Sequence, residues 1–224
     1  MLRRLAIIVA GGSGTRMGTD LPKQFMLLAG KPIMMHTIEK FHQSNCEIIL
    51  VLNVDFHDQW NELCKTYSFE IPHKLIKGGR NRFESVKNGL KSISENALVA
   101  IHDAVRPLIE LDTINNAFDC ADKNGNAVVV VTSKDSLRKV ENDTSYSVPR
   151  SDYFIVQTPQ IFDKNTLDKA YKEEFRNEFT DDASVVEKLG VKIHLVEGKQ
   201  SNIKITYKED LAIAETILKL RVKD

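Results

Sequence analysis

Cysteine is scarce in this chain. Its 224 residues include only Cys46, Cys64 and Cys120, and no two of them form a CxxC pair. An odd number without metal-binding spacing argues against a disulfide framework or a zinc site, so we expect reduced packing thiols in a cytoplasmic protein. Long apolar runs are also missing. No segment approaches the length of a membrane span, and the run that follows Arg3-Arg4 is too short for a signal-peptide core.

The chain also lacks an excess of charge of either sign. Its 31 Lys and Arg residues balance 31 Asp and Glu residues. No overall field would attract nucleic acid or an anionic membrane, so we expect neither as a partner, and any basic site must be local. The hydrophobic content of 42% is enough for a core. With this length, it predicts a single domain over residues 1–224.

Four short runs are apolar throughout: Leu5–Ala10, Ile48–Leu52, Leu98–Ile101 and Ala127–Val131. Strands of this kind are typical of a parallel sheet that is covered on both faces. Apolar residues at helical spacing lie between the runs, within residues 56–67, 86–93 and 111–121. A last helix near 208–220 is indicated by acidic residues at its start and basic residues at its end. This alternation of strands and helices predicts an α/β fold with a doubly wound, mostly parallel sheet.

Residues 134–160 depart from this pattern. They are polar and strand-like, with few apolar residues around an Asn142-Asp143-Thr144-Ser145 turn. A hairpin with so little apolar surface is marginal alone. We therefore expect a projecting β-hairpin arm that gains its stability against another subunit.

The first apolar run leads into a glycine-rich loop, Gly11-Gly12-Ser13-Gly14-Thr15-Arg16-Met17-Gly18. The spacing does not match the GxGxxG dinucleotide fingerprint, and the Gly-Lys-Ser/Thr of a P-loop is missing. Glycines at the end of a buried strand leave backbone N–H groups open to a phosphate chain, and Arg16 and Lys23 supply two cations nearby. The segment is interpreted as a nucleoside triphosphate site; the alternative is a tight turn with solvated side chains.

A second glycine turn, Gly78-Gly79, opens a helix that contains Ser85. It is either a capped helix start or a second wall of the pocket, where Gly79 admits a flat base and Ser85 binds its edge. His102 and Asp103 follow a buried strand, at the edge where α/β sheets bind ligands. We interpret His102 as a structural residue and Asp103 as a ligand for ribose or a metal.

Two further segments carry candidate residues. Thr180-Asp181-Asp182-Ala183-Ser184 has the pattern of a helix N-cap with acidic residues in the first turn. In Asn202-Ile203-Lys204-Ile205-Thr206, alternation places the two isoleucines on one face and Lys204 on the other. Lys204 either faces water or supplies a third cation to the phosphates.

Six motifs in this order and spacing, GGxGTRMG…PKQ, GGxxRxxSVxNGL, HDAxRP, QTPQ, TDDAS and NIKIT, span the chain from Leu5 to the final helix. Together they resemble the 2-C-methyl-D-erythritol 4-phosphate cytidylyltransferases, of which the ribitol-5-phosphate cytidylyltransferases are close relatives. The resemblance implies a Rossmann-like nucleotidyltransferase fold. It also implies transfer of CMP from CTP to methylerythritol phosphate in the non-mevalonate isoprenoid pathway, with Mg²⁺, by a homodimer whose arms complete each other's sites.

The resemblance also assigns roles to residues. Arg16, Lys23 and Lys204 match the catalytic cations around the CTP phosphates. The family's nucleotide contacts match Ala10, Gly11 and Gly12 in the loop, and its cytosine contacts match Gly79 and Ser85. The ribose contact matches Asp103, for which metal binding is the alternative. Matches to contacts with the sugar phosphate are Arg106, Thr180 and, on the arm and reaching the neighbouring subunit's site, Ser136 and Arg150.

The chain departs from the family pattern at Val9, Gly11, Val105 and Ser136. Valine after HDA also occurs in the ribitol enzymes, which therefore stay as the alternative. Arg150 and the intact TDDAS favour the methylerythritol enzymes. Two other classes are weighed against both. A dehydrogenase is disfavoured because no Tyr is followed by Lys four positions on, and a nucleotide sensor has no need of Lys23, Lys204 and a dimer arm together.

Overall fold

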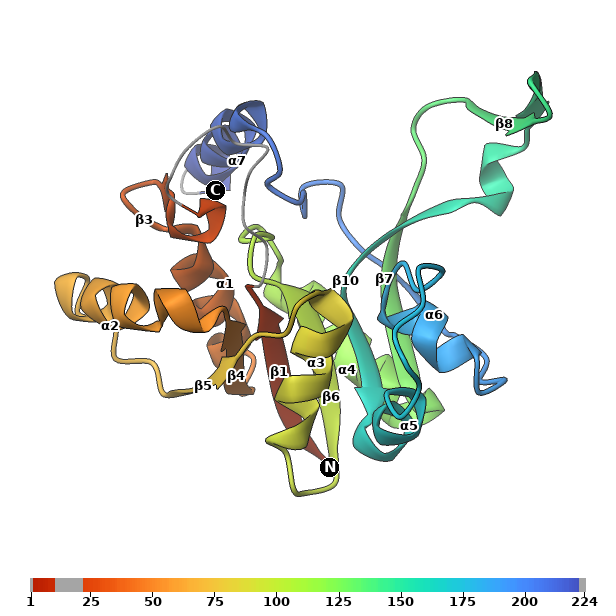
Figure 1. Ribbon diagram of the computed structural model, residues 1–224. Helices are drawn as coiled ribbons and strands as arrows, with labels where there is room; N and C mark the ends of the chain where they lie inside the picture. Colours follow the sequence, from red (N-terminus) through yellow and green to blue (C-terminus); the bar gives the residue numbers. More distant parts are fainter. Residues whose placement is uncertain (1, 11–21, 222–224) are drawn as a thin grey trace.

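The computed structural model describes residues 2–10 and 22–221. These residues form a central sheet of seven strands in the order β11-β7-β10-β6-β1-β4-β5 (Figure 1). Neighbouring strands pair in parallel, except that β10 is antiparallel to β6 and to β7. The strands are Arg3–Val9 (β1), Glu47–Leu52 (β4), His73–Lys77 (β5), Ala97–Asp103 (β6), Asn126–Thr132 (β7), Phe154–Asp163 (β10) and Leu195–Glu197 (β11). The predicted doubly wound, mostly parallel sheet is confirmed.

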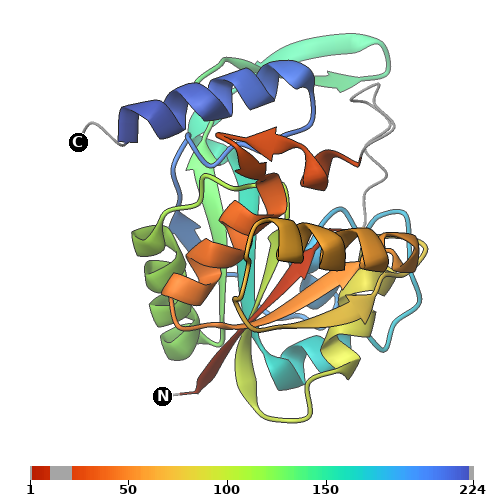
Figure 2. The same ribbon diagram turned by 90° about the vertical axis from the view of Figure 1, so that its left-hand side faces the viewer.

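Helices cover both faces of this sheet (Figures 1 and 2). One face carries α1, α2 and α4, and the other carries α3, α5 and α6, as the two large apolar clusters show. The helices are Ile33–Gln43 (α1), His57–Thr66 (α2), Arg82–Lys91 (α3), Leu111–Asn124 (α4), Lys164–Ala170 (α5), Asp182–Glu187 (α6) and Lys208–Arg221 (α7). The helices predicted within 56–67, 86–93, 111–121 and 208–220 are all present, whereas α1 and α5 were not predicted.

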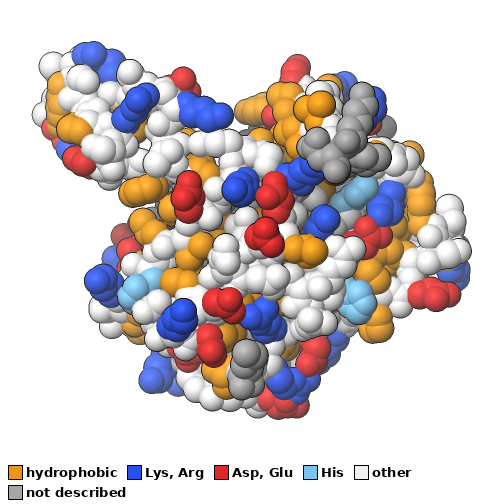
Figure 3. All heavy atoms as spheres, turned by 180° about the vertical axis from the view of Figure 1, so that it is seen from behind, with side chains coloured by type: hydrophobic (Ala, Val, Ile, Leu, Met, Phe, Trp, Pro, Cys, Tyr) orange, Lys and Arg blue, Asp and Glu red, His pale blue; other side chains and the backbone are white. Residues whose placement is uncertain are grey.

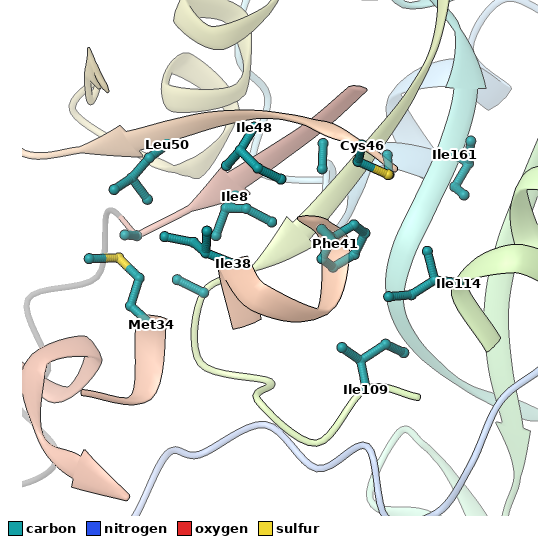
Figure 4. Packing of buried hydrophobic residues seen from close by; sticks show 14 of the residues in the cluster. Ile8, Met34, Ile38, Phe41, Cys46, Ile48, Leu50, Ile109, Ile114 and Ile161 are labelled. Carbon is teal, nitrogen blue, oxygen red and sulfur yellow. The ribbon is translucent and has the colours of Figure 1, made fainter. Parts of the chain in front are cut away.

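Neighbouring residues of β1 serve opposite faces of the sheet. Ile8 packs with Met34, Ile38 and Phe41 of α1 (Figure 4), while Ile7 belongs to the cluster on the other face. Both isoleucines are fully buried. Each side chain buried in this way contributes about 1.5–3 kcal/mol, so the sheet is stabilised from both sides and its strand ends are held rigidly.

A third, smaller cluster holds the chain that follows the sheet. Ile205 is fully buried and packs with Val105, Leu28 of β2 (Leu27–Leu28) and Ala214 of α7. Helix α7 lies across one end of the molecule beside β3 (Lys31–Pro32) (Figure 2). The Ile205 amide donates to the Val105 carbonyl at 2.9 Å. The neighbouring Lys204 side chain is 42% exposed. The predicted alternation is confirmed, and it fixes Lys204 beside the loop after β6.

The predicted arm is a two-stranded hairpin of β8 (Leu137–Glu141) and β9 (Thr144–Val148). Its turn uses Asn142 and Asp143 at positive φ of 47° and 62°, as a two-residue hairpin turn requires. The hairpin projects away from the body and forms a separate lobe when seen from behind (Figures 1 and 3). The end of the 134–160 segment lies in the sheet, because β10 begins at Phe154 and residues 157–160 are buried.

None of the helices in residues 2–10 and 22–221 combines the length and apolar character needed to cross a membrane.

Candidate active site

The carboxyl ends of β1 and β6 lie side by side. Val9 is in register with Asp103, and the Ala104 amide donates to the Val9 carbonyl at 3.0 Å. Ala10 therefore lies close to Asp103, at the edge where open α/β sheets bind ligands. Three residues that the motifs assign to this nucleotide site, Gly11, Gly12 and Arg16, lie outside the described residues. Their roles stay predictions.

Asp103 is contacted by three cationic side chains from different parts of the chain. Its Oδ1 lies 3.4 Å from Nε of Arg82, the first residue of α3. Its Oδ2 lies 3.3 Å from Nε of Arg106 and 3.0 Å from Nζ of Lys204. The structure thus brings together Asp103, Arg106 and Lys204, which the sequence predicts for the site. Arg82 is a further member of the site; it stands within the GGxxRxxSVxNGL motif, but its position there predicts no role.

The charge of Asp103 is set by these neighbours. Burial alone raises the pKa of a carboxyl, because the ionised form loses its hydration. The positive charges of Arg82, Lys204 and Arg106 outweigh burial and hold the pKa of Asp103 well below its usual range. Asp103 is therefore ionised at neutral pH and keeps the three cations close together before any substrate binds.

His102 is fully buried and is fixed in one neutral tautomer. The Arg106 carbonyl, 3.3 Å from Nε2, can only accept, so Nε2 carries the proton. Nδ1 then accepts from the Thr158 hydroxyl at 3.0 Å, and the hydroxyl oxygen accepts from the Asp103 amide at 3.2 Å. Burial lowers the pKa of His102 to about 3. These contacts agree with the interpretation of His102 as a structural residue.

Lys23 lies in a single 3₁₀ turn, η2 (Lys23–Phe25), and is only 9% exposed. Its Nζ donates to the Ile205 carbonyl at 3.0 Å. The next residue, Gln24, donates from Nε2 to the Ala10 carbonyl at 3.0 Å. The turn that carries Lys23 is therefore tied through Gln24 to Ala10, directly after β1, and through Lys23 itself to the residue that follows Lys204. The two lysines assigned to the triphosphate thus lie near each other in the fold.

The second glycine turn is a capped helix start. The Asn81 side chain accepts from the Glu84 amide at 2.8 Å. The Ser85 hydroxyl donates to the Asn81 carbonyl at 2.8 Å and accepts from the Gly79 amide at 3.0 Å. A Cβ at Gly79 would lie 2.3 Å from Glu84 Cβ, so only glycine fits this packing. The contacts of Gly79 and Ser85 with cytosine stay predictions, because the turn geometry accounts for both residues by itself.

A cleft of about 300 Å³ opens beside Asp103. Thr180, predicted as a substrate contact, lines it directly before Asp181, the N-cap of α6. The predicted capping is confirmed, since Asp181 Oδ1 accepts from the Ser184 amide at 2.8 Å and the Ser184 hydroxyl accepts from the Asp181 amide at 3.2 Å. The cleft is lined by Arg82, Asp103, Arg106, Val156, Gln157, Thr158, Gln160, Thr180, Asp181 and Lys204.

Ser136 and Arg150 lie on the arm and not among the residues that line this cleft. Both are exposed, and Arg150 Nη1 donates to the Lys134 carbonyl at 2.8 Å, across the base of the arm. Within the described part of one chain, the structure therefore does not bring them to Asp103.

Sequence reasoning missed the ion pair between Arg82 and Asp182. Nη1 and Nη2 of Arg82 donate to the two carboxylate oxygens of Asp182 at 2.9 and 2.7 Å. Asp182 is fully buried. The sequence gives each residue a local explanation, since Asp182 fits the acidic first turn of a helix and Arg82 opens another helix. Only the packing of α6 against the start of α3 joins them.

The described residues hold no cluster of three His, Cys, Asp or Glu side chains that could bind a metal ion. Asp103, the predicted candidate ligand, is surrounded by three cations, which disfavours direct binding of a metal ion there. Mg²⁺ needs few protein ligands when phosphate oxygens coordinate it. The residues present therefore fit a metal ion that is held by a bound triphosphate, and not one held in a cage of protein side chains.

Comparisons with known proteins identify the family of this chain. The family model of 2-C-methyl-D-erythritol 4-phosphate cytidylyltransferase matches residues 5–220. Enzymes with this name from Bacteroides fragilis and Azobacteroides pseudotrichonymphae are 46% and 47% identical, over 96% and 97% of this chain and 99% and 100% of theirs. The crystal structure of 4-diphosphocytidyl-2C-methyl-D-erythritol synthase from Anaerococcus prevotii superimposes with a TM-score of 0.84 at 28% identity, covering 97% of this chain and 99% of that one. The chain therefore belongs to the 2-C-methyl-D-erythritol 4-phosphate cytidylyltransferase family.

Proposed function

We propose that this enzyme transfers CMP from CTP to 2-C-methyl-D-erythritol 4-phosphate. The products are 4-diphosphocytidyl-2-C-methyl-D-erythritol and pyrophosphate, in the non-mevalonate pathway of isoprenoid precursors. Family membership and the names of the relatives support this reaction over the dehydrogenase and sensor alternatives, and do not favour ribitol phosphate as the acceptor. The observation that carries the proposal is the group of three cations around ionised Asp103, in a cleft at the carboxyl end of β6.

The reaction requires charge neutralisation and does not require a general base. The nucleophile is an oxygen of a phosphate monoester, which is mostly dianionic at neutral pH because its second pKa is about 6. Proton removal is therefore unnecessary, and His102, buried and neutral, needs no part in it. The obstacle is the approach of a dianion to a triphosphate. Positioning and electrostatic stabilisation supply most of the catalysis in such a case.

Placement and position within the motifs support the roles that we assign to the cations. Lys204 is the most exposed of the three that contact Asp103, so its ammonium group can turn from that carboxylate to a phosphate. Lys23 and Arg16 flank the glycine-rich loop in the sequence. We assign Arg16, Lys23 and Lys204 to the phosphates of CTP, and Arg106 and Thr180 to the sugar phosphate. We assign Ala10, Gly11, Gly12, Gly79, Ser85 and Asp103 to the nucleoside and its phosphate chain.

We further propose that Mg²⁺ binds through the phosphate oxygens of CTP. When bound, it neutralises part of the charge that develops on the transferred and leaving phosphates.

We also propose that the enzyme is a homodimer that forms through the arm. The hairpin pairs only with itself among the described strands, and apolar side chains of the arm are exposed: Val140 and Tyr146 on the hairpin are 69% and 42% exposed, and Tyr153 after it is 44% exposed. Apolar surface of this kind is typical of an interface. Such a contact carries Ser136 and Arg150 to the partner's cleft, where an arginine fork suits the phosphate of the acceptor. The cytoplasmic location stays a prediction.

The test is pyrophosphate release with the purified enzyme, CTP and either methylerythritol phosphate or ribitol 5-phosphate, repeated with ATP, GTP and UTP. We expect release with CTP and methylerythritol phosphate alone. Equal or faster release with ribitol 5-phosphate would overturn the choice of acceptor. Equal rates with all four nucleotides would overturn the assignment of a cytosine pocket.

A further inference from the structure

We propose that Asp182 and Tyr171 are positioning residues, which act on the reaction by holding Arg82 and, through it, Asp103. The inference rests on the proposed function, because it concerns the same cleft. Neither Asp182 nor Tyr171 is among the residues that line the cleft, and neither is predicted as a site residue from the sequence.

Asp182 is a buried carboxylate whose hydrogen bonds come from two sides. Arg82 donates to it twice, at 2.9 and 2.7 Å, and the Tyr171 hydroxyl donates at 2.6 Å. A two-pronged contact between arginine and carboxylate fixes the plane of the guanidinium group as well as its distance. Because a buried ionised group is costly unless it is fully paired, this arrangement leaves Arg82 little freedom to turn.

Tyr171 is itself held in place by aromatic packing. It is 3% exposed, and its ring stacks on Phe83 with centroids 4.7 Å apart and planes 23° from parallel. Phe83 follows Arg82 directly in α3. The stack therefore holds the Tyr171 ring in place while its hydroxyl donates to Asp182. Together these two contacts join the start of α3 to the start of α6.

This restraint decides which atoms of Arg82 reach Asp103. With Nη1 and Nη2 occupied by Asp182, only Nε–H points to Asp103, at the long distance of 3.4 Å. Asp103 is thus held loosely by Arg82 and stays open to Lys204, Arg106 and a ligand. Without the charge of Asp182, the fork of Arg82 is released to bind Asp103 with both prongs, which competes with Lys204 for that carboxylate.

The experiment is a double-mutant cycle on kcat/KM for pyrophosphate release. Asp182→Asn keeps the shape of the side chain and removes its charge, and we expect a loss of at least about tenfold. Asp182 and Asp103 are linked only through Arg82. We nevertheless expect kcat/KM of the Asp182→Asn/Asp103→Asn variant to lie within about threefold of that of Asp103→Asn alone, because both changes act on the contact between Arg82 and Asp103. A purely structural role lowers the folded fraction by a constant factor, so the two losses would multiply, and that result would overturn the inference.

Tyr171→Phe covers the case in which Asp182→Asn does not fold. It keeps the aromatic stack and the ion pair, and removes one hydrogen bond. We expect a loss of about threefold to tenfold, again absent in the Asp103→Asn background. A Tyr171→Phe enzyme with unchanged kcat/KM would overturn the inference.

The matched control is Asp168→Asn. Asp168 accepts from the buried Lys164 ammonium at 2.6 and 2.5 Å, on α5 and outside the cleft, so the same change in charge leaves kcat/KM unaltered there. A loss in this control as large as in Asp182→Asn would also overturn the inference. A wild-type enzyme without turnover would instead overturn the proposed function, and this inference with it.

Discussion

Replacement of Lys204 by alanine separates its proposed part in catalysis from its part in stability. The Lys204 ammonium lies 3.0 Å from Asp103 Oδ2, and its side chain is 42% exposed. An ion pair this accessible to water contributes at most about 1 kcal/mol. Asp103 also keeps Arg82 and Arg106 as partners in the variant. For a domain of this size, a loss of 1 kcal/mol lowers Tm by about 2–4 °C.

The catalytic cost should be much larger. Removing one preorganised contact to a developing charge reduces kcat by about 10²–10³. We therefore expect Lys204→Ala to lose at least two orders of magnitude in steady-state pyrophosphate release, while its melting curve barely moves. Lys208→Ala, an exposed lysine four residues later at the start of α7, is the control and should match the wild type in both measurements. Turnover within about threefold of the wild type would refute the electrostatic reasoning.

Three further outcomes are expected. Arg150→Ala should raise KM for the sugar phosphate about tenfold, with little effect on KM for CTP. Mixed dimers of Arg150→Ala and Lys23→Ala subunits should regain activity. Confirmed mixed dimers without any gain in activity would contradict a shared site. Gly79→Ala places a Cβ 2.3 Å from Glu84 Cβ, so the turn must shift, and calorimetry should detect weaker CTP binding. His102, with its pKa lowered to about 3, is neutral when folded and takes up a proton on unfolding below about pH 6.5. Stability should thus fall as pH drops from 6.5 toward 3, and thermal melts at pH 7 and 5 should differ less in His102→Asn than in the wild type.

Four of the parallel strands, β1, β4, β6 and β7, could be predicted because their signal is local, whereas the less apolar edge strands β5 and β11 were not predicted. The run Leu5–Ala10 is apolar on both sides, and β1 accordingly buries Ile7 and Ile8 against opposite layers. The edge at which Asp103 and Ala10 meet follows from the general rule for open α/β sheets. The alternation around Lys204 was equally local, since burial of Ile205 leaves the lysine only the other side.

The missed elements depend on contacts that no local pattern records. The apolar residues of β10 fall in two short groups, 154–156 and 161–162, which the QTPQ stretch separates and which follow the polar arm, so the sequence did not indicate a strand between β6 and β7. Its reversed direction returns the chain from the arm to the cleft, where Thr158 meets His102. The pair of Arg82 and Asp182 spans 100 residues, and each partner has a sufficient explanation within its own helix.

The antiparallel strand and the buried ion pair explain how one carboxylate gathers cations from three distant segments. Arg82 comes from α3, Arg106 from the loop after β6, and Lys204 from the segment that Ile205 anchors. Like charges placed so closely repel one another, so without Asp103 the empty cleft would lose its order or bind a stray anion. Ionised Asp103 removes that repulsion until a phosphate arrives. Because Lys204 is the most exposed of the three, we expect it to detach most easily, and under the proposed function its exchange from Asp103 to a phosphate would turn a stabilising contact into a catalytic one.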